Sequence, residues 1–139
     1  MEKQRVLILC TGNSARSQMA EGLLRHLAGE RFDVTSAGTI ATYVRPQAIA
    51  VMNEIGIDIS GHRSKSLDEF LATPFDFVIT VCDNANQTCP MFPGKSERIH
   101  WSIDDPAFAG RSDEERLAAF RQARDELRAK LVDFVSHQG

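Results

Sequence analysis

The chain has 139 residues, a net charge of −3, 42% hydrophobic residues and 25% charged residues. These values are typical of one globular domain, here residues 1–139, and they argue against disordered or collagen-like chains. The slightly acidic balance gives no reason to expect nucleic acid or an anionic membrane as a partner, and no apolar run approaches the ~20 residues of a membrane span.

The first half of the chain alternates apolar runs with loops. The run 6–9 predicts a strand buried on both faces, as in a parallel sheet. A helical period of apolar residues begins at Ser17, and Gly29 suits its C-cap. Residues 32–37 predict a second strand, and a helix should run from Pro46 to about residue 55.

The second half continues this alternation. Residues 66–69 and 112–115 have the pattern of a capping box, which predicts the start of a short helix and of the longest helix. Residues 75–81 predict a third strand and residues 99–101 a fourth. Strands alternating with helices favour a doubly wound α/β domain with a parallel sheet.

Three cysteines, Cys10, Cys82 and Cys89, are present. The N-terminal sequence has no cleavage-site pattern, so we expect a cytoplasmic protein, in which structural disulfides are rare. An odd number of thiols cannot all pair within one chain, so at least one is free. Buried, unreactive thiols are the commonest use of free cysteine, and this alternative applies to all three.

The chemical candidates follow the ends of predicted strands. Cys10 ends the first strand, Cys82 follows the third, and Asp104 and Asp105 follow the fourth. Ligands of parallel α/β sheets bind beyond the carboxyl ends of the strands, so these residues should meet at one edge.

The segment from Cys10 to Ser17 has the spacing C-x5-R-S. Gly12 and Asn13 tolerate the positive φ of a tight loop, and the loop lies between a buried strand and a helix start. Its backbone N–H groups would bind a tetrahedral oxyanion, with a bidentate contact from the arginine. The predicted oxyanion-binding residues are Thr11, Gly12, Asn13, Ser14, Ala15 and Arg16.

The same surroundings bear on Cys10. A thiol beside an arginine at a helix N-terminus favours the thiolate, which is the nucleophilic form. Ser17 could donate a hydrogen bond to that thiolate, or it could be only the N-cap or a first-turn residue of the helix, and the sequence leaves both roles open.

Residues 6–22, VLILCTGNSARSQMAEG, resemble the anion loop of the low-molecular-weight protein tyrosine phosphatase superfamily. Residues 36–38 and the Asp105-Pro106 pair resemble that family as well. The resemblance implies a three-layer fold, with a four-stranded parallel sheet of order 2-1-3-4 between helices. It also implies that Asp105 is the general acid, with Asp104 the lesser candidate, although Asp-Pro is also common in turns.

This superfamily includes two chemistries. Tyrosine phosphatases need the nucleophile, the arginine and the acid, and they usually carry aromatic residues after the Asp-Pro pair. Here only Phe108 follows, and the single tyrosine, Tyr43, lies elsewhere in the sequence. Thioredoxin-coupled arsenate reductases add two redox cysteines after the third strand, and residues 81–90, VCDNANQTCP, resemble that pair.

The resemblance therefore implies an arsenate reductase with a thiol relay. Cys10 attacks arsenate, Cys82 attacks Cys10, and Cys89 then attacks Cys82, after which a thioredoxin-type protein reduces the last disulfide. We expect residues 82–89, which are mostly polar, to be mobile.

Several alternatives and partners stay open. The alternatives are a tyrosine or small-molecule phosphatase and a non-catalytic oxyanion-binding or redox-sensing protein. Phosphate or sulfate should compete with arsenate, glutaredoxin could replace thioredoxin, and a monomer is expected. We expect no bound cofactor, and the C-x6-C spacing of Cys82 and Cys89 does not fit a zinc site.

Some reductases of this branch bind potassium through an Asn, a Ser and two acidic residues. Asn13, Glu21 and Ser36 match three of these positions, but Lys65 stands where the fourth, a carboxylate, would fall. An ammonium repels a cation, so we predict that the potassium site is weak or missing.

Overall fold

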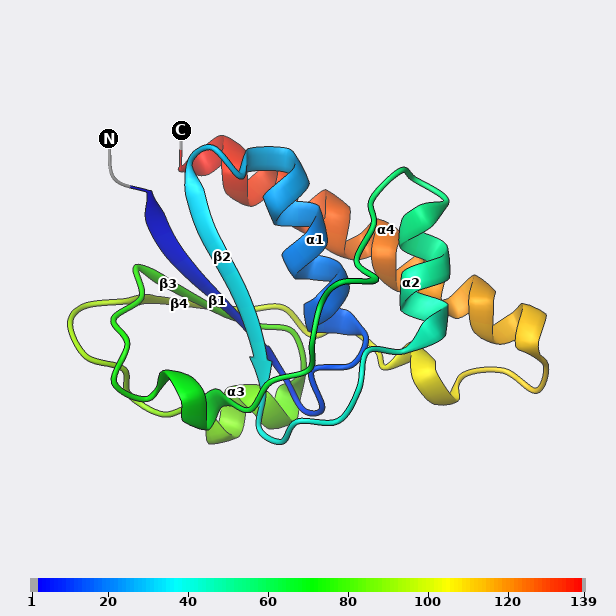
Figure 1. The fold of residues 1–139 in the computed structure, drawn as a ribbon, viewed down its shortest axis with the longest axis horizontal. Helices are drawn as coiled ribbons and strands as arrows, with labels where there is room; N and C mark the ends of the chain where they lie inside the picture. Colours follow the sequence, from blue (N-terminus) through cyan, green and yellow to red (C-terminus); the bar gives the residue numbers. More distant parts are fainter. Residues whose placement is uncertain (1–2, 139) are drawn as a thin grey trace.

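The computed structural model describes residues 3–138. Figure 1 shows a parallel sheet, whose four strands have the predicted order β2-β1-β3-β4. The strands are β1 (Gln4–Cys10), β2 (Phe32–Gly38), β3 (Phe77–Thr80) and β4 (Glu97–His100). β1 lies between two partners, which explains why its residues 6–9 are apolar throughout and fully buried.

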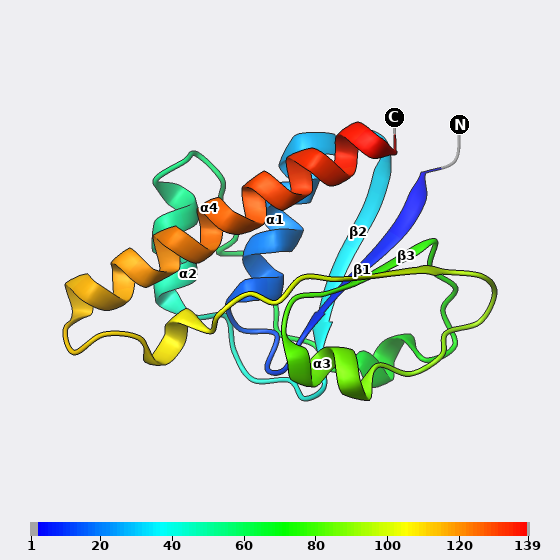
Figure 2. The ribbon, with the colours of Figure 1, turned by 180° about the vertical axis from the view of Figure 1, so that it is seen from behind.

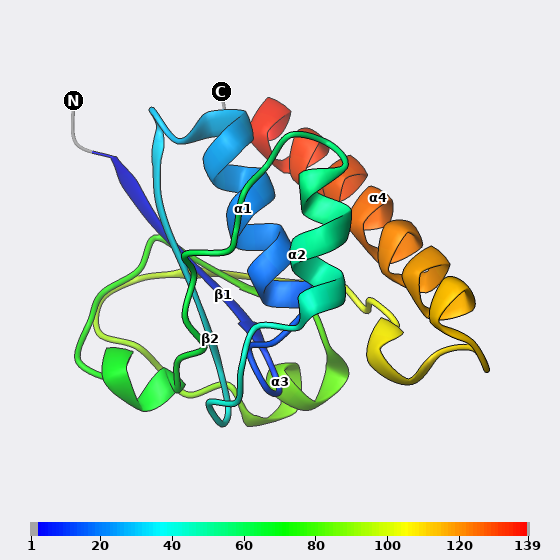
Figure 3. The ribbon, with the colours of Figure 1, turned by 45° about the vertical axis from the view of Figure 1, so that its right-hand side comes forward.

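Three helices cover one face of the sheet: α1 (Arg16–Ala28), α2 (Pro46–Asn53) and α4 (Asp113–His137) (Figures 2 and 3). The 3₁₀ turn η1 (Leu67–Phe70) and the chain after residue 89 lie on the other side, where Phe75 packs against Phe70 and Phe92. α3 (Asp83–Thr88) lies at the carboxyl ends of the strands, and η2 (Pro106–Phe108) precedes α4. Among the described residues, no helix is both long and apolar enough to span a membrane.

The two capping-box predictions are only partly correct. Ser66 opens a single 3₁₀ turn, and its hydroxyl accepts from the N–H of Asp68 at 3.2 Å. Ser112 caps α4 by accepting from the N–H of Glu115 at 3.1 Å, but the Glu115 carboxylate accepts from Arg111 instead of Ser112. Turn geometry before each helix decides which N–H the side chain reaches.

One face of α4 is an apolar stripe and packs on the sheet and on α2. Phe134 lies with its ring centroid 5.5 Å from that of Phe32 and 5.1 Å from that of Phe77. The stripe also includes a buried arginine, Arg124, which donates to the Val51 carbonyl (2.8 Å) and to Glu54 (3.0 Å). Sequence periodicity gave no sign of this residue because an arginine counts as polar in an amphipathic pattern.

Glu54, at the end of α2, joins this helix to α4. Hydrogen bonds from Arg121, followed by those from Arg124, lower the pKa of Glu54 to about 2. A depressed folded-state pKa gives stability that is present above the unfolded value near 4.5 and lost as pH falls towards about 2.

We therefore expect Glu54→Gln to lower the melting temperature at pH 7, with a difference that disappears near pH 2. Melting curves across pH would check this, with Glu30→Gln, an exposed glutamate, as control; a constant difference would contradict it.

Candidate active site

The segment Cys10–Arg16, here called the thiol loop, joins the end of β1 to the start of α1. Asn13 has a φ of +48°, as predicted. Gly12 does not use the positive φ that it tolerates; among the described glycines, those with positive φ are Gly56, Gly94 and Gly110. Gly12 instead brings its backbone close to Thr42, whose hydroxyl donates to the Gly12 carbonyl at 2.7 Å.

The end of β2 holds the thiol loop in place. The N–H of Thr39 donates to the Cys10 carbonyl (3.2 Å), and the N–H of Ile40 donates to the Thr11 carbonyl (3.1 Å). A Cβ on Gly38 would lie 2.6 Å from the carbonyl oxygens of Thr11 and Ile40. Only glycine fits at this close approach of two backbones, which gives a physical reason for the glycine in the 36–38 pattern.

A cavity of about 230 Å³ lies over the thiol loop. Five of the six predicted oxyanion-binding residues line it, together with the nucleophile and Asp105; the lining residues are Cys10, Thr11, Gly12, Ser14, Ala15, Arg16, Ile40, Thr42, Tyr43, Arg45 and Asp105. The sixth residue, Asn13, is fully buried, and its side chain bonds to Ser17 and Ser36. The cavity has the size and charge to admit a tetrahedral oxyanion.

Ser17 contacts the candidate nucleophile. Its Oγ lies 2.8 Å from the Sγ of Cys10, and both side chains are buried. Helix α1 begins at Arg16, so Ser17 is its second residue; Ala15 holds the N-cap position without a side-chain bond. The N-cap role is therefore wrong; Ser17 is a first-turn residue of α1, and its hydroxyl also faces the sulfur.

We expect Ser17→Ala to slow alkylation of Cys10 by iodoacetamide about tenfold at pH 7, because a hydrogen bond to a charged group contributes roughly 1.5–3 kcal/mol. Mass spectrometry of the Cys10 peptide over time would measure this rate. Ser136→Ala, which removes a hydroxyl on the exposed face of α4, is the control. An unchanged rate in a folded Ser17→Ala protein would contradict the prediction.

Arg16 and Asp105 face each other across the cavity. Their side chains are 3.6 Å apart (Nη2 to Oδ2), and Arg16 also donates to the Ile103 carbonyl at 2.9 Å. The other oxygen of Asp105 accepts from the N–H of Ala107 at 3.0 Å and so caps η2. Asp104 does not line this cavity, which supports Asp105 as the candidate acid.

The remaining two cysteines lie at opposite ends of α3. Cys82 is its buried N-cap: its Sγ accepts from the N–H of Ala85 and lies 3.3 Å from the hydroxyl of Thr11 in the thiol loop. Cys89 follows the helix and is half-buried; burial raises the pKa of this thiol, while Arg98 lowers it. All three thiols are free, and the segment between Cys82 and Cys89 is helical rather than irregular.

Tertiary contacts hold the start of α3. The imidazole of His100 lies 2.9 Å from Asp83 (Nε2 to Oδ1) and 2.8 Å from the Thr80 hydroxyl through Nδ1. The hydrogen bond with His100 lowers the pKa of Asp83. These contacts join β3, β4 and α3 and explain why six residues without an apolar stripe form a helix.

Two aromatic rings lie near the cavity, and the sequence pointed only to Phe108, which follows the Asp105-Pro106 pair. Arg45 lies between two exposed rings, with its guanidinium carbon 5.3 Å from the centroid of Tyr43 and 5.4 Å from that of Phe108. The sequence placed Tyr43 away from the site, but it lines the cavity. Nothing in the local sequence signals this, because residues 43–45 reach the thiol loop through the N–H of Arg45, which donates to the Ser14 carbonyl (2.9 Å).

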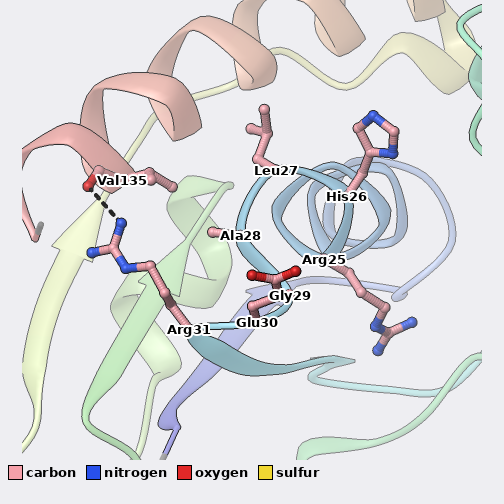
Figure 4. Close-up of a pocket in the computed structure, with 8 residues that line it drawn as sticks. All are labelled: Arg25, His26, Leu27, Ala28, Gly29, Glu30, Arg31 and Val135. Atoms are coloured by element: carbon pink, nitrogen blue, oxygen red, sulfur yellow. Dashed lines mark hydrogen bonds between the residues drawn. The ribbon is translucent and has the colours of Figure 1, made fainter.

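A larger hollow of about 530 Å³ lies at the other end of α1 (Figure 4). Arg31 there donates towards the Val135 carbonyl at 3.5 Å, whereas the side chain of Arg25 points the other way. Its side chains diverge instead of facing a common point, and α1 separates the hollow from Cys10 by roughly 20 Å along its axis. It offers no reactive thiol and no arrangement typical of catalysis.

Comparisons with known proteins agree with the fold and the thiol loop. The low molecular weight phosphotyrosine protein phosphatase family matches residues 5–138. An arsenate reductase of Halalkalibacterium halodurans is 47% identical over 135 residues, which cover 97% of each chain.

Two solved structures are also similar. An arsenate reductase in the phosphate binding state is 33% identical with a TM-score of 0.79, covering 96% of this chain and 98% of that one. A thioredoxin-dependent arsenate reductase of Corynebacterium glutamicum is 28% identical with a TM-score of 0.75, covering 97% of this chain and 61% of that one. The chain therefore belongs to the low molecular weight phosphotyrosine protein phosphatase family.

Proposed function

We propose that the protein is an arsenate reductase in which Cys10, Cys82 and Cys89 form a disulfide relay. The observation that carries this proposal is the contact between Thr11 in the thiol loop and the second cysteine, Cys82, at 3.3 Å. A phosphatase needs a single thiol, together with the arginine and the acid, whereas here a second thiol contacts the thiol loop. The full-length similarity to arsenate reductases supports the same activity.

The first step is attack of the Cys10 thiolate on arsenate held by Arg16 and the thiol loop. A Cys10–arsenic(V) bond forms, and Asp105 supplies a proton to the departing oxygen, which leaves as water. The Cys82 thiolate then attacks the Cys10 sulfur. The bonding electron pair stays with arsenic, which leaves as arsenite, and a Cys10–Cys82 disulfide forms.

The second disulfide requires a change in α3. Cys89 attacks Cys82 and releases Cys10 as a thiolate. Seven residue steps at about 1.5 Å each separate the two cysteines by roughly 10 Å along the helix, whereas a disulfide needs Cα atoms within about 7 Å. Helix α3 must therefore unwind, which is the motion expected for residues 82–89.

The Cys82–Cys89 disulfide then passes to an external dithiol protein of the thioredoxin type, as a thioredoxin-dependent relative suggests. A relay that depends on free thiols suits a reducing compartment, so we place the enzyme in the cytoplasm, acting as a monomer of one domain. Thioredoxin and glutaredoxin can be told apart by measuring arsenate turnover with each protein, supplied with its own reducing system.

Mass spectrometry after a single turnover without reductant tests the relay. Mixed with one equivalent of arsenate, the reduced protein should release one equivalent of arsenite and contain a Cys82–Cys89 disulfide with free Cys10. Sulfate in place of arsenate is the control and should leave three thiols. Arsenite release with all three thiols still reduced, or a Cys10–Cys89 disulfide, would overturn the relay.

Phosphomonoester hydrolysis through a phosphocysteine on Cys10 is the second candidate. The exposed ring of Tyr43, which lines the cavity, favours it, because this ring could contact an aryl group. Efficient hydrolysis of p-nitrophenyl phosphate without arsenate reduction would establish this candidate instead. If Cys10 alkylates no faster than a free thiol and neither substrate turns over, a binding or redox-sensing role applies.

A further inference from the structure

A buried polar network lies beneath the thiol loop, on the side away from the oxyanion cavity. At its centre is Glu21, whose side chain is 5% exposed. One carboxylate oxygen accepts from the Ser36 hydroxyl (2.8 Å) and lies 3.8 Å from the ammonium of Lys65. The other oxygen lies 3.2 Å from Arg25 and 3.3 Å from His62.

The network has a defined direction of hydrogen bonds. A carboxylate only accepts, so Ser36 donates to Glu21 and accepts from the amide of Asn13 at 2.9 Å. The second hydrogen of that amide goes to the Ser17 oxygen at 2.8 Å. Ser17 then has its own proton left for the Cys10 sulfur at 2.8 Å. The charge on Glu21 therefore orients a chain of donors towards the nucleophile.

His62 belongs to this network. Its Nδ1 lies 3.0 Å from the Gln18 amide oxygen, and only 12% of its side chain is exposed. Burial lowers the pKa of His62, with Arg25 and Lys65 acting in the same direction and Glu21 opposing. These effects favour the neutral imidazole, which contributes a hydrogen-bond donor to the network instead of a positive charge.

The residues do not fit a potassium ion. The side-chain amide oxygen of Asn13 (Oδ1) already accepts from the backbone N–H of Lys65 (2.8 Å) and from the side-chain amide of Gln18 (2.9 Å). Both carboxylate oxygens of Glu21 face positive or N–H groups, and the Lys65 ammonium is beside the one that Ser36 uses. An incoming cation would find saturated oxygens and a like charge.

We propose that the ammonium of Lys65 is the resident cation of this network, which orients Ser17 towards Cys10 without a bound metal ion. The backbone of Lys65 is tied at both ends, because its N–H donates to Asn13 and its carbonyl accepts from the N–H of Gly38 at 2.8 Å. The side chain is 10% exposed, and Nζ also donates to the Arg63 carbonyl at 3.2 Å. A buried carboxylate is stabilised by positive partners, and the Lys65 ammonium faces the oxygen that also accepts from Ser36, whereas Arg25 faces the other oxygen.

Lys65 is a positioning residue, because it acts through four side chains and does not touch the substrate cavity. The inference rests on Cys10 being the reactive thiol of the proposed function. Alkylation of Cys10 needs neither arsenate nor the relay, so failure of this inference can be told from failure of the proposed function.

The wild-type protein provides the first test. Its melting temperature and its rate of Cys10 alkylation should be the same in potassium, sodium and choline chloride at equal ionic strength. A potassium-specific increase in either quantity would overturn the proposal, because the network would then bind an added cation.

Two variants provide the second test. Lys65→Ala removes the charge and leaves space. The rate of Cys10 alkylation should then fall about three- to tenfold, because Ser17 is less well oriented towards the sulfur. Potassium chloride should restore part of that rate and of the melting temperature, and choline chloride should not. Lys65→Met removes the charge but fills the space, so it should be slow in every salt.

Lys95→Ala, which removes an exposed lysine, is the matched control and should behave as wild type. A Lys65→Ala protein with wild-type alkylation, or one that is slow with no ion-specific recovery, would overturn the proposal. If Lys65→Ala does not fold, the salt comparison on wild type and the Lys65→Met rate decide the matter.

Discussion

Replacing Cys89 with serine is expected to give an enzyme that releases one equivalent of arsenite and then stops. In the proposed relay, Cys10 and Cys82 suffice for the reduction of arsenate to arsenite, since Cys82 lies against the thiol loop. Without Cys89 the Cys10–Cys82 disulfide cannot be resolved, so steady-state turnover with a thioredoxin system should fall by about a hundredfold or more, as for loss of a nucleophile that acts in a covalent relay. Rapid-quench measurement of arsenite and mass mapping of the trapped disulfide would check this.

The matched variant is Cys82→Ser, which should release no arsenite burst, because no thiol then attacks the Cys10 adduct. The two serine variants thus separate the order of the relay. Undiminished multiple turnover in Cys82→Ser would refute the relay, and a burst in Cys82→Ser but not in Cys89→Ser would reverse the two roles.

Arg16→Lys is expected to lower kcat/KM for arsenate by about 10²–10³-fold, the cost of losing one preorganised oxyanion donor. Lysine keeps the charge but cannot make a bidentate contact, and it loses the bond to the Ile103 carbonyl and the pairing with Asp105. Steady-state kinetics with varied arsenate would measure the change. We expect kcat to fall strongly while the melting temperature changes little.

The control for this variant is Arg111→Lys, an exposed arginine outside the cavity, which should keep wild-type kinetics. Phosphate inhibition offers a second readout, because a weakened oxyanion site should raise the inhibition constant in parallel. If Arg16→Lys retained wild-type kcat/KM and phosphate inhibition, Arg16 would not be the oxyanion ligand.

The strand predictions were accurate in order and approximate in length. β3 spans Phe77–Thr80 instead of residues 75–81, and β4 ends at His100 instead of residue 101. Apolar runs mark which segments are buried, but a strand ends where its partner stops pairing. The helix α3 was missed because its six residues have no apolar period; Cys82 as N-cap and His100 at Asp83 stabilise it.

The sequence by itself determined the reactive loop. Cys10, Arg16 and Ser17 lie within eight residues, and their spacing between a buried strand and a helix start is local, so a short pattern is enough to predict them. The parallel alternation of strands and helices also predicted that Cys82 and Asp105 would come to the same edge.

Only the tertiary structure decided what surrounds that loop. Tyr43 and Arg45 reach the cavity, and His62 and Lys65 reach Glu21, through contacts between residues far apart in the chain. Such contacts have no sequence period, because they depend on where the ends of strands and loops meet in space. In the sequence, Lys65 is a mismatch to the expected potassium site. In the structure its buried ammonium lies 3.8 Å from Glu21, so we propose that it takes the place of the potassium ion.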